Sequence, residues 1–234
     1  LILLVLSIAV SVALLIGSLH SIDILVNIFE SQARGSYGDF NVILSSKDQE
    51  NRNLIDMDAI EHLDDEEHIK SIQIPSYLSE DEDVQVNVSG MSIDELKALD
   101  TMERIEGEAL DALGDKEMLI SNQTAEQFDF VLGEEVELTF FNGEEEKYEI
   151  AGLYEKAGVF EYDGEFNVSA VISEEAVFDI YGIDDQYSTI LVKIDAQEAD
   201  KWVEAFNEEN EELKYTANKT YDEGAIVHQL SWIQ

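Results

Sequence analysis

Carboxylates are the side chains of this sequence most able to do chemistry. Of its 234 residues, 53 are Asp or Glu and 13 are Lys or Arg. Four runs are especially acidic: Asp64–Glu67, Glu80–Asp83, Glu144–Glu146 and Glu208–Glu212. Clustered carboxylates suit hard cations such as Ca²⁺, but none of these runs has the spacing and the glycine of an EF-hand loop. The pattern therefore favours a solvated acidic surface over a calcium site.

Histidine and cysteine give no better metal site. His62 and His68 flank an acidic run, and two histidines with nearby carboxylates can hold zinc. Six residues apart and across the end of a predicted helix, they do not share a face. The chain has no cysteine, which excludes disulfides, thiol catalysis and cysteine-bound zinc. We therefore predict no metal and no cofactor.

The serines do not form a hydrolase motif. Ser121, Ser169 and Ser173 are the candidates, and none lies in a Gly-x-Ser-x-Gly sequence. Ser173 is better explained as the N-cap of a helix that begins with two glutamates. Paired carboxylates for glycoside chemistry are so numerous that no pair stands out. We assign no catalytic residue and expect a non-enzymatic domain.

A short aromatic stretch is the best candidate for a contact site. Val159, Phe160 and Tyr162 lie between Gly158 and Gly164, which is typical of a loop. Exposed aromatic side chains on a loop mark a surface for a partner or a substrate. The alternative is that the loop folds back onto the neighbouring β-rich segment, since scattered exposed apolar residues are also common.

Hydrophobic periodicity predicts the elements that position these residues. Residues 69–74 form a short apolar strand that Pro75 would end, and residues 84–88 alternate as a half-buried strand. Ser92 and Glu95 form a capping box before the next helix. Residues 136–140 alternate again and lead into Asn142-Gly143, a strong hairpin signal.

The later part of the chain alternates strands and helices. Strands are expected at 166–172, 188–194 and 213–217. Between them, a helix that starts at Ser173 would end at Gly182, a residue type common just after a helix. The next helix would bury its apolar face, which includes Trp202 and Phe206.

These elements predict an α+β fold, with a split βαβ-type α/β subdomain that is interrupted by a small β-rich subdomain. An N-terminal transmembrane and stalk helix precedes it. The expected parts are 1–34, transmembrane helix and stalk; 35–115, first half of the α/β subdomain; 116–165, β-rich insert; 166–220, second half of the α/β subdomain; and 221–234, helix leading to a next membrane span.

The first residues predict a membrane anchor. Leu1–Leu19 contains no charge and has about the 20 residues that a helix needs to cross a bilayer. A signal peptide is the alternative, but it would be shorter and end in a small-residue cleavage site. The first base after the span is Arg34, so positive charge does not hold this flank inside the cell. We expect a cell-membrane location with the residues after about 20 on the extracytoplasmic side.

Charge excludes one class of partner. The net charge is −40, and no basic stripe exists that could bind a phosphate backbone. Nucleic acid is therefore not an expected partner.

The order of these elements resembles a known family. The relevant residues are Gly38-Asp39-Phe40-Asn41-Val42 after the stalk; Lys116–Leu138, a strand and a helix followed by Gly-Glu-Glu-Val; Tyr148–Gly152, with the pattern Tyr-x-Ile-x-Gly; and Val171–Gly182 followed by Ile190–Ile194. In pattern and order these segments resemble the extracytoplasmic, MacB-like domain of MacB/FtsX-type ABC-transporter permeases.

This resemblance implies a function and partners. In such permeases the external domain couples cytoplasmic ATP hydrolysis to export, extraction or sensing outside the membrane. The implied partners are the membrane, a cytoplasmic ATP-binding subunit and a second copy in a dimer; the substrate is unknown. Motion would pass through the stalk Leu19–Ser31 and the helix Asp222–Gln234. The alternatives are a membrane-anchored sensor or ligand-binding module and an anchored hydrolase.

Overall fold

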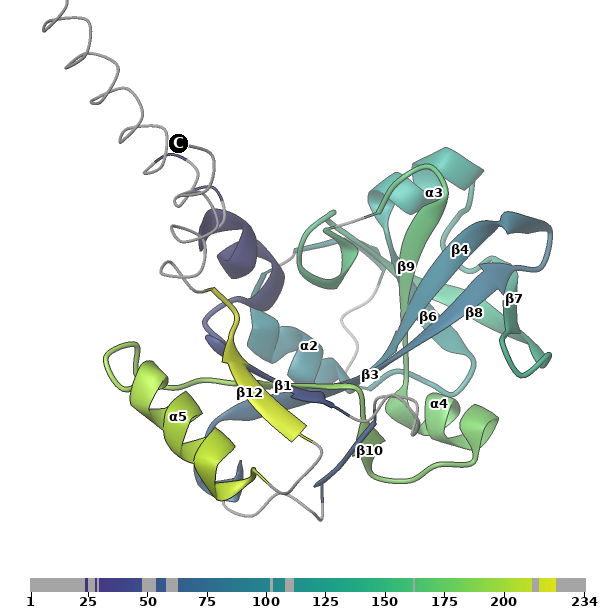
Figure 1. Cartoon of the computed structure of the whole chain (residues 1–234). Coiled ribbons are helices and arrows are strands. Elements are labelled where there is room, and N and C mark those ends of the chain that lie inside the picture. Colours follow the sequence, from purple (N-terminus) through teal and green to yellow (C-terminus); the bar gives the residue numbers. More distant parts are fainter. Residues whose placement is uncertain are drawn as a thin grey trace, which may run out of the picture. The chain divides into compact units, whose positions relative to one another are not determined.

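The computed structural model (Figure 1) describes residues 24, 28, 30–47, 54–57, 63–101, 103–107, 112–161, 163–211 and 215–221. The expected membrane span at 1–19 and the expected helix at 222–234 lie outside these residues. No helix among the described residues is long and apolar enough to cross a membrane. The chain divides into two compact units, Leu1–Arg34 with Tyr221–Gln234, and Gly35–Thr220.

The described residues of the first unit are few. Residues 30–34 of this unit are helical. Arg34 forms an exposed ion pair with Glu30 one turn earlier, 3.3 Å between nitrogen and oxygen. Ile24 and Ile28 are exposed apolar residues of the same stretch.

The unit Gly35–Thr220 mixes strands and helices, so the predicted α+β class is confirmed. The strands are β1 (Val42–Ser46), β2 (Ile55–Asp56), β3 (His68–Leu78), β4 (Asp81–Gly90), β5 (Arg104–Gly107), β6 (Glu117–Ser121), β7 (Glu135–Phe140), β8 (Glu145–Tyr154), β9 (Asn167–Ile172), β10 (Gln186–Tyr187), β11 (Thr189–Val192) and β12 (Tyr215–Lys219). The helices are η3 (Leu63–Asp65), α2 (Ile93–Leu99), α3 (Asn122–Phe128), η4 (Gly158–Phe160), α4 (Glu174–Tyr181) and α5 (Ala199–Glu209).

One large sheet with two differently built regions organises this unit. At one end, β12, β1, β11 and the first part of β3 pair in that order, all antiparallel. At the other end, β3, β4, β9, β6, β8 and β7 pair in a closed ring, because β7 bonds both β8 and β3. The ring contains two parallel pairs, β4 with β9 and β6 with β8. These strands lie on the right of Figure 1.

Each region has its own hydrophobic core. Alternating side chains of the ring strands fill its interior, among them Val88, Leu138 and Ile150, which are all but inaccessible to solvent. The antiparallel end packs against α5, whose stacked Trp202 and Phe206 rings lie 5.1 Å apart. Removing these apolar surfaces from water is the main force that holds the unit together.

The local signals in the sequence match the structure. Ser92 and Glu95 form the predicted capping box of α2, and Ser173 caps α4 by accepting a hydrogen bond from the Ala176 amide. Gly182 ends α4 with a left-handed conformation, as predicted. The turn between β7 and β8 has Gly143 at φ +85°, a conformation that glycine adopts without a steric penalty.

Pro75 does not end its strand, contrary to the sequence prediction. β3 continues through Pro75 to Leu78 and pairs with β4 along this stretch. On its other edge, β3 pairs with β11 only up to Ser71 and with β7 only from Ser76. Amide directions alternate along a strand, so the nitrogen of Pro75 faces the same edge as that of Gln73, in this gap. Its missing N–H removes no ladder hydrogen bond there.

The expected β-rich insert is joined to the rest of the sheet. Residues 116–165 supply β6, β7 and β8, but β6 pairs with β9 and β7 pairs with β3. Both partner strands belong to the segments that were expected to form the α/β halves. The subdivision at 115/116 and 165/166 stays a prediction.

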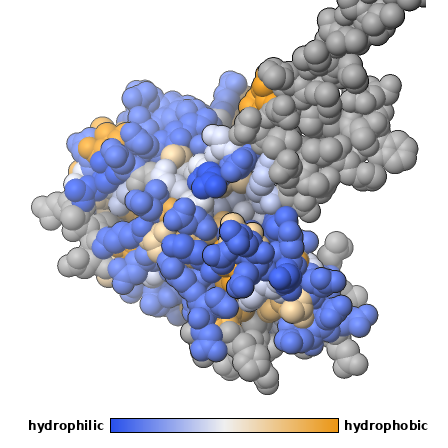
Figure 2. All heavy atoms as spheres, turned by 90° about the vertical axis from the view of Figure 1, so that its left-hand side faces the viewer, coloured by the Kyte–Doolittle hydropathy of each residue, from blue (hydrophilic) through white to orange (hydrophobic). Residues whose placement is uncertain are grey.

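Hydrophilic residues cover most of the described surface in the view of Figure 2, with small separate hydrophobic patches. Large exposed apolar side chains of this unit include the neighbours Val131 and Leu132, and also Phe141 and Phe166. Such a surface fits the net charge of −40.

Candidate functional site

The predicted contact loop folds inward at its central aromatic residue. Phe160, in η4, has no solvent exposure, and its ring centroid lies 6.3 Å from that of Tyr154. Val159 packs, partly buried, against the same cluster. Tyr162 lies outside the described residues. The expectation of an exposed aromatic surface is therefore wrong for Phe160, because its burial gains more free energy than a solvated ring would.

A buried carboxylate fixes the end of this loop. Asp163 is 3% exposed, and its Oδ2 accepts hydrogen bonds from the Ser121 hydroxyl at 2.5 Å and the Thr124 hydroxyl at 2.8 Å. Lys156 Nζ donates to the Asp163 carbonyl oxygen at 2.5 Å. Ser121 also caps α3 by accepting from the Thr124 amide. The Ser121 hydroxyl thus joins the loop to the start of α3.

Burial raises the pKa of the Asp163 carboxyl, and hydrogen bonds from Ser121, Ser169 and Thr124 oppose this rise. A raised pKa in the folded state means that folding favours the protonated acid. The corresponding stabilisation is fully present below the unfolded-state pKa near 3.8 and is lost as the pH rises through the folded-state pKa. At neutral pH, the charge of Asp163 therefore opposes folding.

The variant Asp163→Asn tests this linkage. We expect its free energy of unfolding, relative to that of the wild type, to rise as the pH increases from about 4 to 7. The reason is that the buried carboxyl of the wild type ionises over this range, whereas the amide stays neutral. Urea unfolding of both proteins at several pH values measures the difference, and subtraction removes the shared effect of the other carboxylates. A difference that does not change with pH would show that the carboxyl titrates normally.

The histidines and acidic runs do not assemble a metal site in the part of the chain that the structure describes. No group of three or more His, Cys, Asp or Glu residues there is placed to hold a metal ion. His68 lies in β3, and its Nδ1 is 2.9 Å from the Glu66 carbonyl oxygen. His62 lies outside the described residues.

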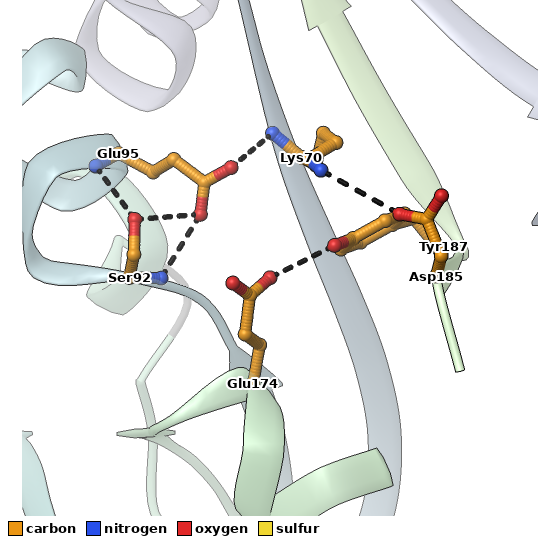
Figure 3. Close-up of polar contacts among 6 residues, drawn as sticks. All are labelled: Lys70, Ser92, Glu95, Glu174, Asp185 and Tyr187. Atoms are coloured by element: carbon orange, nitrogen blue, oxygen red, sulfur yellow. Dashed lines mark hydrogen bonds and ion pairs between the residues drawn. The ribbon is translucent and has the colours of Figure 1, made fainter. Parts of the chain in front are cut away.

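The most connected polar cluster was not predicted from the sequence. We call it the polar junction; it consists of Lys70, Ser92, Glu95, Glu174, Asp185 and Tyr187 (Figure 3). The Lys70 amide donates to Glu95 Oε1 at 3.0 Å. Its ammonium lies 3.7 Å from Asp185 Oδ1 and 4.4 Å from the centre of the Tyr187 ring. Lys70 therefore contacts α2 with its backbone, and β10 and the residue just before β10 with its side chain.

Tyr187 and Glu174 complete the junction. The Tyr187 hydroxyl donates to Glu174 Oε2 at 3.0 Å, and its ring meets Phe178 of α4 edge-on at 5.7 Å. Burial raises the pKa of Glu174, and the carboxylate of Glu95 adds to the rise. Burial and the charge of Glu174 also raise the pKa of Tyr187, so its hydroxyl keeps the proton that it donates.

The polar junction connects the two regions of the sheet. Lys70 lies in the part of β3 that pairs with β11, and Tyr187 belongs to the core of that antiparallel end. Glu174 begins α4, whose Ala176 and Val177 pack into the core of the ring. Apart from the capping box of Ser92 and Glu95, no signal in the sequence could have brought these residues together, because Lys70 and Tyr187 are 117 residues apart. The junction holds elements in place and contains no activated nucleophile.

A cavity lies at the gap along β3. It has a volume of about 340 Å³, and its lining includes Ile72, Pro75, Phe141 and Tyr181. The gap arises where β11 has ended and β7 has not yet begun, so side chains of several elements face it. A second, smaller hollow near α4 is acidic and is lined by Asp115, Glu144, Glu146 and Asp179.

Several solved structures resemble this fold. The periplasmic region of MacB from Actinobacillus actinomycetemcomitans is 10% identical, with a TM-score of 0.51, and the match covers 86% of this chain and 96% of that one. The extracellular domain of the noncanonic ABC-type transporter YknZ from Gram-positive bacteria is 13% identical, with a TM-score of 0.50, covering 76% and 98%. No curated protein matches the sequence.

The fold is therefore that of external regions of ABC-type transporters. The family model of the MacB-like periplasmic core domain matches residues 1–208. This chain belongs to that family, and the resemblance inferred from its sequence is confirmed.

Proposed function

We propose that this chain is the extracytoplasmic part of an ABC-transporter permease subunit, and that it transmits motion between the membrane and the outside. Its partners would be the membrane, a cytoplasmic ATP-binding subunit and a second copy of the chain. Membership of the MacB-like family carries this proposal. The role is mechanical: cytoplasmic ATP hydrolysis would drive export, extraction or sensing through the external domain.

The architecture supports a mechanical role. β3 runs through both regions of the sheet, so a displacement of one region reaches the other through continuous backbone. The polar junction ties α2, α4 and β10 to this strand near its start. Such packed and hydrogen-bonded elements transmit displacement because they do not deform freely.

A spin label can test for this motion. These 234 residues contain no cysteine, so Glu204→Cys on the exposed side of α5 adds a single labelling site to them, and any cysteine elsewhere in the permease is first replaced by serine. The full-length permease, labelled before reconstitution with its ATP-binding subunit, should show a label-to-label distance between copies that differs between ATP-bound and ADP-bound states. A distance that nucleotide does not change would contradict motion transmission, and the absence of any pair signal would contradict the dimer.

The variant Tyr187→Phe tests whether the polar junction contributes to this motion. It removes one hydrogen bond to a charged, half-buried acceptor, for which the expected loss is about 1.5–3 kcal/mol in the free energy of unfolding. The fold should survive, and the nucleotide-dependent distance change should shrink. Tyr77→Phe, on β3 outside the junction, is the matched control and should leave the distance change intact. If the distance change is the same in both variants, the polar junction does not take part in transmitting motion.

A further inference from the structure

The cavity at the gap along β3 is lined by segments that lie far apart in the sequence. Leu54 comes directly before β2, Phe141 belongs to the β7–β8 hairpin, and Ile183 lies between α4 and β10. We propose that this cavity binds a neutral, planar, two-ring aromatic molecule that carries an N–H group, such as an indole. This inference is independent of the transport role proposed above.

The edge of β3 in the gap offers hydrogen-bond acceptors but no free donor. The Gln73 amide already donates to Ser188 Oγ at 2.7 Å, and Pro75 has no N–H. The carbonyl groups of Gln73 and Pro75 point to the same edge as their nitrogens, as in any antiparallel strand. No strand of the described chain pairs with β3 between Ser71 and Ser76 on this edge. A ligand that enters the gap therefore meets carbonyl oxygens, to which its N–H can donate.

The rim of the cavity is fixed in position. Phe141 is 60% exposed, yet its ring meets that of Tyr77 edge-on at 5.5 Å. The next residue, Asn142, donates from Nδ2 to the Ile180 carbonyl oxygen at 3.0 Å and accepts from the Glu144 amide at 3.1 Å. Such preorganisation reduces the entropic cost of binding. An aromatic ligand against Phe141 would remove apolar surface from water and gain a ring contact.

The size of the cavity suits two fused rings. Its volume is about 340 Å³, roughly twice that of the ~150 Å³ cavity, lined by Leu, Ile and Phe, that binds benzene in another protein. The lining here is of the same kind, and it includes the buried side chains of Leu54, Ile72 and Ile74.

The lining also selects an uncharged ligand. Its polar side chains are Gln73, Asn142 and Tyr181, and none of the described residues that line it is charged. An ion that left water for this cavity would find no partner of opposite charge there, which costs free energy. An anion would in addition meet the net charge of −40. A neutral aromatic molecule with one N–H avoids both costs.

Titration of indole into the full chain in detergent, followed by the δ1-methyl NMR signals of isoleucine, tests the proposal. We expect saturable shifts at Ile72, Ile74 and Ile183, which line the cavity. The signals of Ile93 and Ile120, which are buried elsewhere, should not move. A shift is read at a named residue, so indole that dissolves in the detergent does not contribute. Shifts that are absent, or that spread evenly over all five methyl groups, would overturn the proposal.

Two matched truncations locate the binding site. Phe141→Ala removes a wall of the cavity and should weaken indole binding about fivefold or more. Phe166→Ala makes the same change at a ring that is 62% exposed and does not line the cavity, so the affinity should stay within about twofold of the wild type. Both rings are largely solvated, so both variants should fold. Equal affinities of the two variants would place indole outside this cavity.

Two relatives of indole test the ligand class. 1-Methylindole has no N–H to donate and should bind about threefold more weakly or worse. Indole-3-carboxylate is an anion at neutral pH and should bind at least about tenfold more weakly. If either compound binds as tightly as indole, the carbonyl acceptors or the uncharged lining do not select the ligand, and the assigned class is wrong.

Discussion

Replacing Phe160 with alanine should lower the free energy of unfolding by about 3–5 kcal/mol. The side chain is completely buried and packs in a cluster with Leu119, Val171 and Tyr154. Truncation removes the transfer free energy of the ring and leaves a cavity that strands β6 and β9 cannot close without breaking their pairing. Urea unfolding followed by circular dichroism measures the loss.

Phe166→Ala is the matched control for this prediction. Phe166 is 62% exposed and lies just before β9, so its truncation should change the free energy of unfolding by less than about 0.5 kcal/mol. Similar losses for the two variants would contradict the buried position of Phe160. Deletion of Gly158–Gly164 would remove Phe160 and Asp163, which are both buried, so we expect it to unfold the ring region.

Replacing Gly38 with alanine should cost about 2–5 kcal/mol of unfolding free energy, again by urea titration. Gly38 has φ +58°, a left-handed conformation that costs an alanine roughly 1–2 kcal/mol. Its added Cβ would also clash with the carbonyl oxygen of Leu99 at the end of α2, a backbone atom that cannot turn away. Such overpacking typically costs about 1–3 kcal/mol more.

Gly35→Ala provides the contrast three residues earlier. Gly35 is helical, and a Cβ there would meet no atom within 4 Å. Alanine is a better helix former than glycine, so this variant should gain up to about 1 kcal/mol. A loss at Gly35, or no loss at Gly38, would contradict the described geometry of this connection. Gly38 opens the segment Gly38–Val42 on which the family resemblance partly rests.

Much of the local structure could be predicted from the sequence. The capping box at Ser92, the cap at Ser173, the left-handed end at Gly182 and the hairpin at Asn142-Gly143 depend on side chains a few residues apart. Alternation in β4 and β7 likewise reports which face of each strand is buried. The order of these elements was enough to place the chain in its family.

The candidate site was less predictable. Phe160 and exposed aromatic residues look alike in sequence, and only its packing against Tyr154 shows that it is buried. Pro75 reads as a strand end, yet its position in the gap between β11 and β7 lets β3 continue. The junction of Lys70 with Tyr187 joins strands that lie far apart along the chain.

The sequence by itself therefore determined the acidic charge, the caps and turns, and the family, because these follow from composition and short-range spacing. Only the tertiary structure decided that β3, β4 and β9 close a ring with β6, β7 and β8, and that Pro75, Phe141 and Tyr181 line one cavity. The physical reason is that strand pairing and side-chain burial depend on contacts between distant segments. Local propensity does not specify which of the possible partners a strand will choose.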